Sequence, residues 1–160
     1  MSTYHMRRED RNISDQTEIL KIIKNAKFST IGMAKENEPY LVTLSHGYDE
    51  KNNVLYFHCA NEGKKVDFIK NNSMVCATII ENNGYVDGKC EQHYSSLLIF
   101  GKMFIIENIE EKKNGLNVIL HHLESEPESI LKRNIPSDES YHKIIILKLI
   151  IERITGKKGK

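Results

Sequence analysis

The 160 residues of the chain are enough for one ordinary domain, and its 23 basic and 22 acidic side chains nearly cancel. This balance excludes an overall field that draws the protein to nucleic acid or to a membrane surface, so any anion site has to be local. We expect a single domain over residues 1–160, with an N-terminal arm at 1–13 and a basic C-terminal tail at 156–160 that frays.

The N-terminal half of the chain predicts one helix followed by paired strands. Asp15 is a typical N-cap residue with Glu18 three positions later, a capping-box pattern, and apolar residues then recur at helical spacing up to Ala26. Three strands are expected next, at Phe28–Ala34, at the alternating run Pro39–Gly47, and at Val54–Cys59. A short helix over residues 64–71 follows.

The C-terminal half adds three strands and one helix. The strands are expected at Met74–Ile80, Tyr94–Ile106 and Tyr141–Ile151, and Gly101 marks a bulge or bend in the second of them. Apolar residues recur at helical spacing over residues 116–123. The regular βαβ alternation of a parallel sheet is missing. The expected fold class is therefore mainly β, a six-stranded antiparallel split β-barrel with flanking helices.

The junction after Cys59 carries the most informative local signal. Lys64 and Lys65 stand at the predicted start of a helix, where the positive end of the helix dipole disfavours a cation. A bound phosphate removes this conflict, because free N–H groups attract an anion and each lysine adds a charge-assisted bond of roughly 1.5–3 kcal/mol. Gly63 would let the backbone approach the ligand closely. Alternatively, both lysines are ordinary solvated surface residues.

His58 ends the strand before this junction, and its imidazole can donate, accept or change charge near neutral pH. The alternative is a half-buried histidine that bonds a neighbouring carbonyl. His46 is expected to be exposed. Of His121 and His122, we expect one to point to water and the other to pack against the barrel.

Three cysteines at unrelated spacings, Cys59, Cys76 and Cys90, predict free thiols in a reducing compartment. Cys90 and His93 form half of a zinc-binding pattern, but the sequence offers no second half, so no metal is expected. The first twelve residues lack the apolar core of a secretory signal, and nowhere do eighteen apolar residues run together. We therefore expect a cytoplasmic protein.

Several segments taken together resemble a known family. Leu55–His58 followed by Glu62–Asn72 resembles the phosphate-binding segment of the nitroimidazole-resistance (Nim) reductases, which belong to the pyridoxamine 5'-phosphate oxidase-like superfamily of FMN-binding split barrels. Other pieces are similar to family motifs in the family's order, namely Met6–Arg11, Pro39–Leu44, Phe100-Gly101 and Ile154–Lys157. The ordered set spans nearly the whole chain.

The resemblance implies FMN held between the two subunits of a homodimer. Its phosphate would lie at the helix start, and its ring against the strand backbone at residues 42–44. In similar proteins the histidine matching His58 lies close to the cofactor, where it orients substrate or relays a proton. The family often has arginine at Ser95, so one cationic contact is missing here. The implied cofactor contacts are Val42, Thr43, Leu44, His58, Cys59, Gly63, Lys64, Lys65 and Ser96.

The activity implied by the resemblance is that of an FMN-dependent oxidoreductase of the nitroimidazole-reductase type. Reduced flavin would pass two electrons to a small planar electrophile, with His58 as the catalytic residue. Two alternatives stay open: a flavin-binding carrier or sensor without turnover, and a member of the same barrel that binds haem or pyridoxal phosphate. The segment Ile144–Ile151 is apolar on both faces, which favours a homodimer on physical grounds as well.

Overall fold

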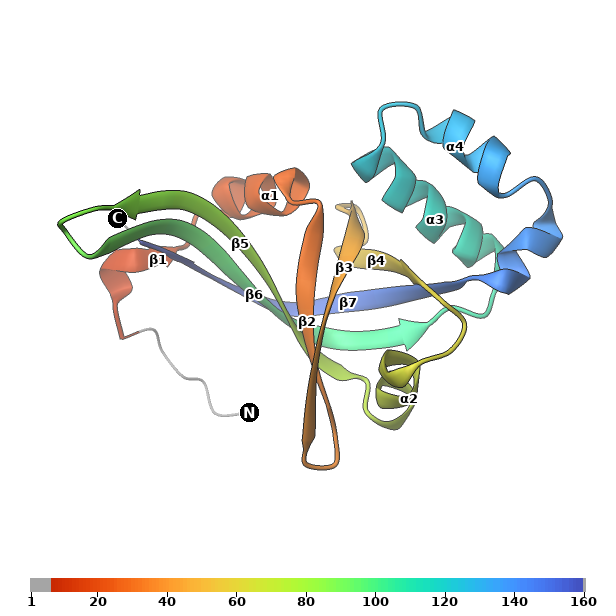
Figure 1. The fold of residues 1–160 in the computed structure, drawn as a ribbon, viewed down its shortest axis with the longest axis horizontal. Helices are drawn as coiled ribbons and strands as arrows, with labels where there is room; N and C mark the ends of the chain where they lie inside the picture. The colour runs from red at the N-terminus through yellow and green to blue at the C-terminus, as the bar shows by residue number, and fades with distance from the viewer. Residues whose placement is uncertain (1–6, 160) are drawn as a thin grey trace.

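Seven antiparallel strands form one sheet that closes on itself. The computed structural model describes residues 7–159, and Figure 1 draws its elements. The strands are β1 (Asn12–Ile13), β2 (Phe28–Lys35), β3 (Glu38–Asp49), β4 (Val54–Cys59), β5 (Met74–Val86), β6 (Glu91–Ile105) and β7 (Ile145–Lys158). They follow the order β1-β7-β4-β3-β2-β5-β6, and a further pairing of β6 with β7 closes the barrel. The predicted barrel is confirmed as β2 to β7, and the short β1 adds a seventh strand.

The helices fall into two groups with different roles. They are α1 (Gln16–Asn25), α2 (Lys64–Asn71), α3 (Ile109–Leu123) and α4 (Pro127–Asn134), with 3-10 turns at Glu9–Arg11 and Asp138–Lys143. Apolar side chains of α1 and α2 belong to the interior cluster of the barrel, whereas α3 covers the outside of β3 and β4. In Figure 1, α3 and α4 lie together at the upper right, apart from α1 and α2. Within residues 7–159, no helix is long and apolar enough to cross a membrane.

Side chains alternate between two apolar clusters along β4. Leu55, Phe57 and Cys59 point into the barrel, while Val54 and Tyr56 pack outward against α3. A strand buried on both faces has to be apolar at nearly every position, as this one is. Each fully buried aliphatic or aromatic side chain stabilises the fold by roughly 1.5–3 kcal/mol.

Close packing holds α3 on the barrel. A Cβ at Gly47 would lie 2.5 Å from the Cα of Ile119, so only glycine allows the helix to approach β3 this closely. The Lys148 ammonium donates to the Glu111 carboxylate over 2.6 Å and joins β7 to α3. This hydrogen bond raises the pKa of Lys148. The glycine and the ion pair together fix the position of α3.

The start of α1 follows the sequence prediction in part. The Asp15 carboxylate accepts a hydrogen bond from the Thr17 amide over 2.9 Å, which confirms the predicted N-cap. Glu18 does not serve the cap as the capping-box pattern suggests. Its carboxylate lies 3.2 Å from the ammonium of Lys158 on β7.

The C-terminal tail does not fray up to Lys158, so that expectation is wrong. Strand β7 continues to this residue, and Lys157 and Gly156 pair with Asn12 and Ile13 of β1. The pairing supplies backbone hydrogen bonds that local composition does not reveal. At its other end β7 begins at Ile145 rather than at Tyr141, because residues 138–143 form a 3-10 turn.

The sequence predicted only part of the β5–β6 hairpin and did not predict α4. Strands β5 and β6 extend through the expected loop, with a bulge between Asn82 and Tyr85. The bulge predicted at Gly101 is confirmed, because the register of β6 with β7 shifts between Phe100 and Gly101. Helix α4 had no counterpart among the predicted elements.

His46 is buried, so the prediction that it is exposed is wrong. Its Nε2 lies 3.4 Å from the carbonyl of Ile23, and its ring centre lies 5.0 Å from that of His122. Burial lowers the pKa of His46 to about 4. His122 packs inward with Nε2 2.7 Å from the carbonyl of Ala26, while His121 is exposed, as expected for this pair.

Candidate functional site

The start of α2 differs from the starts of α1 and α3. Asp15 and Asn108 cap those two helices with side-chain oxygens, whereas the N-cap of α2 is Gly63, which offers no side chain. Gly63 has a φ of 127°, and nothing lies within 4 Å of the position that its Cβ would occupy. The start of α2 therefore lacks a capping side chain and has open space beside Gly63, an arrangement that suits a bound anion.

The two lysines after Gly63 have different surroundings. The Lys64 ammonium pairs with the Glu38 carboxylate and lies 5.3 Å from the ring centre of Tyr40. Lys65 is half-buried, and its charge acts on the Cys59 thiol, where it opposes the rise in pKa that burial causes. Lys64 is thus held by a carboxylate, whereas no ion pair of Lys65 is found among residues 7–159.

Strand β3 places the three predicted ring contacts on different faces. Val42 and Leu44 pack against the barrel core, and Thr43 points outward. The Thr43 hydroxyl lies 2.8 Å from the hydroxyl of Thr30 on β2. In the register of the described residues, β4 pairs with β3 only from His46 to Asp49. The backbone edge of residues 42–44 that faces away from β2 is therefore not used by β4, and this gap is the split in the barrel.

His58 and Cys59 point to opposite faces of β4 and do not share a site. Cys59 lies in the barrel core, where burial raises the pKa of its thiol. His58 lines an apolar cavity of about 270 Å³ outside the barrel. The other lining residues are Leu116, Leu120, Ile130, Leu131, Asn134, Ile135 and Ile144. His58 stays accessible to solvent, and its partial burial lowers its pKa.

Ser96 lies at a third place, on β6 beside the end of β7. Its hydroxyl donates to the carbonyl of Lys157 over 3.3 Å. In the β6–β7 register Ser95 and Ser96 stand opposite Lys158 and Lys157. Two lysines thus stand opposite this serine pair, and the ammonium of Lys158 is engaged by Glu18. The predicted cofactor contacts of one chain are spread over the start of α2, both faces of β3, the barrel core at Cys59, the His58 cavity and this strand pair.

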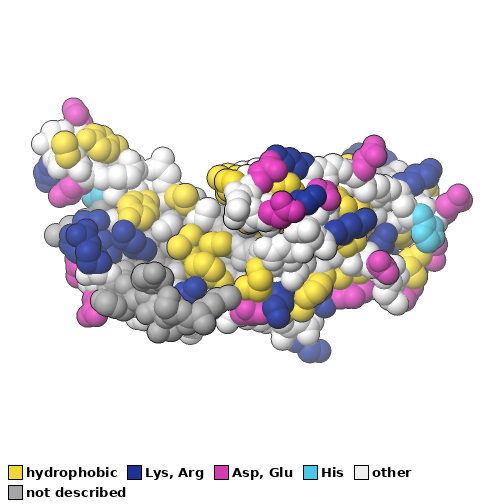
Figure 2. All heavy atoms as spheres, turned by 90° about the horizontal axis from the view of Figure 1, so that it is seen from below, with side chains coloured by type: hydrophobic (Ala, Val, Ile, Leu, Met, Phe, Trp, Pro, Cys, Tyr) yellow, Lys and Arg dark blue, Asp and Glu magenta, His cyan; other side chains and the backbone are white. Residues whose placement is uncertain are grey.

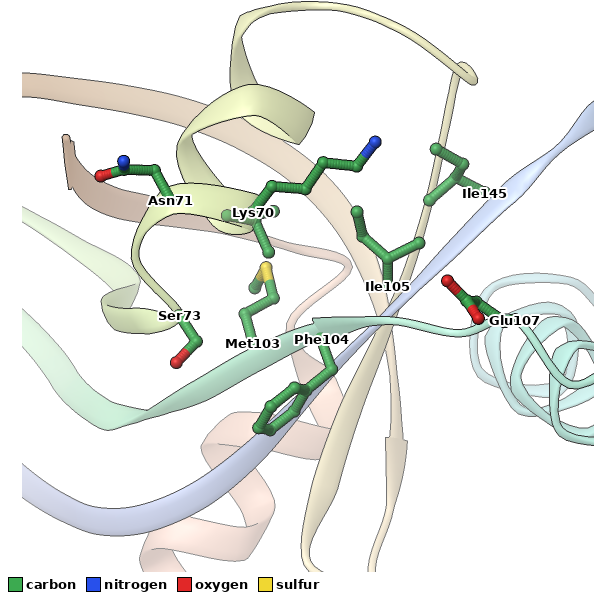
Figure 3. A pocket seen from close by; sticks show the side chains of 9 residues that line it. Lys70, Asn71, Ser73, Met103, Phe104, Ile105, Glu107 and Ile145 are labelled. Carbon is green, nitrogen blue, oxygen red and sulfur yellow. The ribbon is translucent and has the colours of Figure 1, made fainter.

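A further cavity lies at the other end of α2. It measures about 480 Å³ and is lined by Ile69, Lys70, Asn71, Ser73, Met103, Phe104, Ile105, Glu107 and Ile145. Figure 3 shows Lys70 reaching from α2 and Glu107 from the segment after β6. The C-terminal end of a helix dipole is negative, and Glu107 adds a negative charge. Lys70 and Glu107 bring opposite charges to this cavity, and none of the predicted contacts lines it.

Sequence reasoning missed the contribution of α4 to the His58 cavity. Ile130, Leu131 and Asn134 lie on this helix, and Ile135 is its C-cap. A signal was present, because Pro127 occupies the first turn and basic residues occupy the last. The polar composition of the segment masked it.

Comparison with protein families identifies the fold. A family model described as pyridoxamine 5'-phosphate oxidase matches residues 15–158. The chain belongs to the pyridoxamine 5'-phosphate oxidase family. The resemblance seen in the sequence segments is thereby confirmed at the level of the family. A comparison with functionally curated proteins gave no match.

Several solved structures are similar to this chain in fold. A candidate 5-nitroimidazole antibiotic resistance protein from Bacteroides thetaiotaomicron is 27% identical, with a TM-score of 0.79 over 98% of this chain and 96% of that chain. An FAD-binding protein from Mesorhizobium loti is 18% identical, with a TM-score of 0.70 over 94% and 98%. An FAD and haem binding protein from Mycobacterium smegmatis is 12% identical, with a TM-score of 0.79 over 94% and 74%. The last two show a shared fold alone.

Proposed function

We propose that the protein is an FMN-dependent oxidoreductase of the nitroimidazole-reductase type. Reduced flavin would pass two electrons to a small planar electrophile. The family match over residues 15–158 supports a flavin-related enzyme, and the structure that is 27% identical supports the nitroimidazole branch. The FAD-binding proteins of the same fold support a flavin as the cofactor.

The observation that carries the cofactor proposal is the uncapped start of α2. Backbone amides, an open approach at Gly63 and the nearby charge of Lys65 together provide what a phosphoryl group needs. Lys64 would join only by exchanging Glu38 for the phosphate. Tyr40 lies beside Lys64, and Thr43 follows three residues later on β3, on the order of 10 Å away. This distance separates the proposed phosphate contact from the proposed ring contacts.

The residues of this chain would bind and orient the cofactor, while the flavin supplies the electron transfer. The free backbone edge at residues 42–44 can hydrogen-bond the polar edge of a ring system. His58 carries a lowered pKa and is neutral near pH 7, so it can donate one hydrogen bond to a substrate and accept another. The apolar side chains around it would contact the ring of the substrate.

We also propose a homodimer with FMN at the subunit interface. Large apolar side chains are exposed on the outward face of β2, β3, β5 and β6, with 59% of Phe28, 69% of Leu41, 64% of Ile80 and 43% of Leu98 accessible. Figure 2, which draws one face of the molecule, shows several hydrophobic patches among charged side chains of both signs. Exposed apolar side chains of this size favour association. Gel filtration should show a species of twice 18.5 kDa, and a monomer at micromolar concentration would contradict the dimer.

A cytoplasmic location is part of the same proposal. Cys59, Cys76 and Cys90 are all free thiols, as the sequence predicted. Free thiols persist in reducing compartments. Fractionation of the native host would test the location.

Two spectra test the proposed activity. The visible spectrum of protein purified without added cofactor should show oxidised flavin, and bands of haem or of pyridoxal phosphate would support the alternative members of the fold. The flavin is then reduced anaerobically with dithionite and mixed with metronidazole. Return of the oxidised spectrum supports turnover, whereas a bound flavin that stays reduced would identify a carrier or sensor.

A further inference from the structure

The cavity beside His58 differs in composition from two other cavities of the protein. Its walls come from the end of β4, from α3, and from α4 with the segment that follows it. Six of its eight lining residues are leucine or isoleucine, and the two polar ones are His58 and Asn134. By contrast, the depression near Lys64 is lined by Lys35, Glu36, Glu38 and Asp67 as well, and the cavity in Figure 3 carries Lys70 and Glu107.

We propose that this cavity binds a small uncharged aromatic molecule with one hydrogen-bonding group, which His58 contacts, and that α4 sets the size of the ligand. The identification of this molecule with the electron acceptor rests on the proposed function. Its binding to the cavity does not.

The preference for an uncharged ligand follows from the lining. None of the eight residues is Lys, Arg, Asp or Glu, so an ionised group would lose water without gaining an ionic partner. The apolar surroundings lower the pKa of His58 and keep its ring neutral, which removes the one cation that the site could offer. A neutral imidazole still provides one donor and one acceptor.

The size of the cavity points to a single ring with a substituent. Dry cavities of about 150 Å³ lined by aliphatic side chains hold benzene in other proteins. The volume here is about 270 Å³. The additional volume leaves room for a substituent on the ring.

Helix α4 forms one wall of this cavity, and it is attached to the protein more loosely than the barrel strands are to one another. Only Pro127 of its eight residues is buried. Leu131 and Ile135 pack against the outer apolar cluster, and Glu128 lies 3.2 Å from Nε2 of His121 on α3. Substitutions in α4 can therefore change the cavity without disturbing the barrel core, which is why we assign ligand selection to this helix.

Three probes of nearly equal shape test the proposal on the protein as purified. Benzamide is neutral and carries an acceptor and a donor, benzoate adds a charge, and toluene lacks the polar group. Each is titrated into ¹⁵N-labelled protein, and amide signals of residues 116–135 are followed by NMR. We expect benzamide to shift signals of α3 and α4 and to bind at least tenfold more tightly than benzoate.

Variants locate the site and test each part. Ile130→Trp fills the cavity from α4 and should weaken benzamide at least tenfold, whereas Lys132→Trp places the same ring on the exposed side of α4 and should change the affinity less than twofold. His58→Phe should weaken benzamide several-fold and leave toluene unchanged. Unaltered amide spectra outside α4 would show that the variants fold.

The outcomes separate this inference from the proposed function. Shifts that map elsewhere, equal affinity for benzoate and benzamide, or an Ile130→Trp variant that binds normally would overturn the cavity proposal. Binding of benzamide by protein that never takes up FMN would support the cavity and refute the flavin proposal. Uptake of FMN without benzamide binding would support the flavin proposal and refute the cavity proposal.

Discussion

The two faces of β4 show how one strand serves both stability and recognition. Phe57 is fully buried in the barrel, surrounded by side chains of several strands and helices. His58, the next residue, lines a cavity that keeps its ring accessible. Alternation along a strand thus separates a closed core from an outer layer with room for a ligand. The comparison teaches that neighbouring residues of one strand can face a packed core and an accessible cavity.

The largest effect should come from exchanging these neighbours for alanine. Phe57→Ala is expected to lower the free energy of unfolding by about 4 kcal/mol, because it leaves a cavity in the packed core. His58→Ala should cost less than about 1 kcal/mol, since its side chain is accessible. Urea denaturation measures both. Equal losses would mean that the outer layer is as tightly packed as the barrel.

Acid should lower the free energy of unfolding through the buried side chain of His46. Its pKa in the folded protein, about 4, lies below the ordinary 6.5, so the unfolded chain binds the proton more readily. The corresponding stability, roughly 3 kcal/mol, is complete above pH 6.5 and disappears as the pH falls towards 4.

His46→Gln removes this titration while keeping a donor for the Ile23 carbonyl. Its free energy of unfolding should fall less between pH 7 and 4 than that of the wild-type protein. Parallel curves for the two proteins would show that His46 titrates normally.

At the junction after β4, the two ends of α2 should respond differently to loss of a lysine. Lys65→Ala is expected to weaken FMN binding about 10- to 150-fold, the equivalent of a charge-assisted bond of roughly 1.5–3 kcal/mol. Lys70→Ala, at the C-terminal end of the same helix, should change the affinity less than twofold. Flavin fluorescence titration gives both values, and a larger effect at Lys70 would move the phosphate to the cavity in Figure 3.

The smallest effect concerns the helix start that is already capped. Asp15→Ala should destabilise the protein by about 1 kcal/mol, because the Thr17 amide loses its acceptor. Asp15→Asn keeps an acceptor and should cost a few tenths of that amount. Thermal unfolding in the absence of flavin resolves the two. Equal losses in the two variants would show that the hydrogen bond to the Thr17 amide does not stabilise α1.

The sequence correctly predicted features that depend on residues close together in the chain. The N-cap at Asp15, the helix over residues 64–71 and the bulge at Gly101 all follow from capping, periodicity and glycine placement. The ordered tail and the buried His46 could not be read in this way, because partners far along the chain create both. Asn12 pairs with Lys157, and α1 covers His46.

The sequence named candidate site residues but did not reveal how they are arranged. The sequence placed His58, Cys59 and Lys64 close together, yet alternation on β4 separates the first two and Glu38 engages the third. The apolar cavity could not be foreseen, since it depends on α4, whose polar sequence hides a short helix.

The central claim is that the start of α2 binds the phosphoryl group of a mononucleotide, and one comparison of ligands tests it directly. FMN and riboflavin carry the same ring and differ in this group. The account predicts that the wild-type protein binds FMN at least tenfold more tightly than riboflavin, and that Lys65→Ala reduces this ratio. Equal affinity for the two flavins, or a ratio that Lys65→Ala leaves intact, would contradict it.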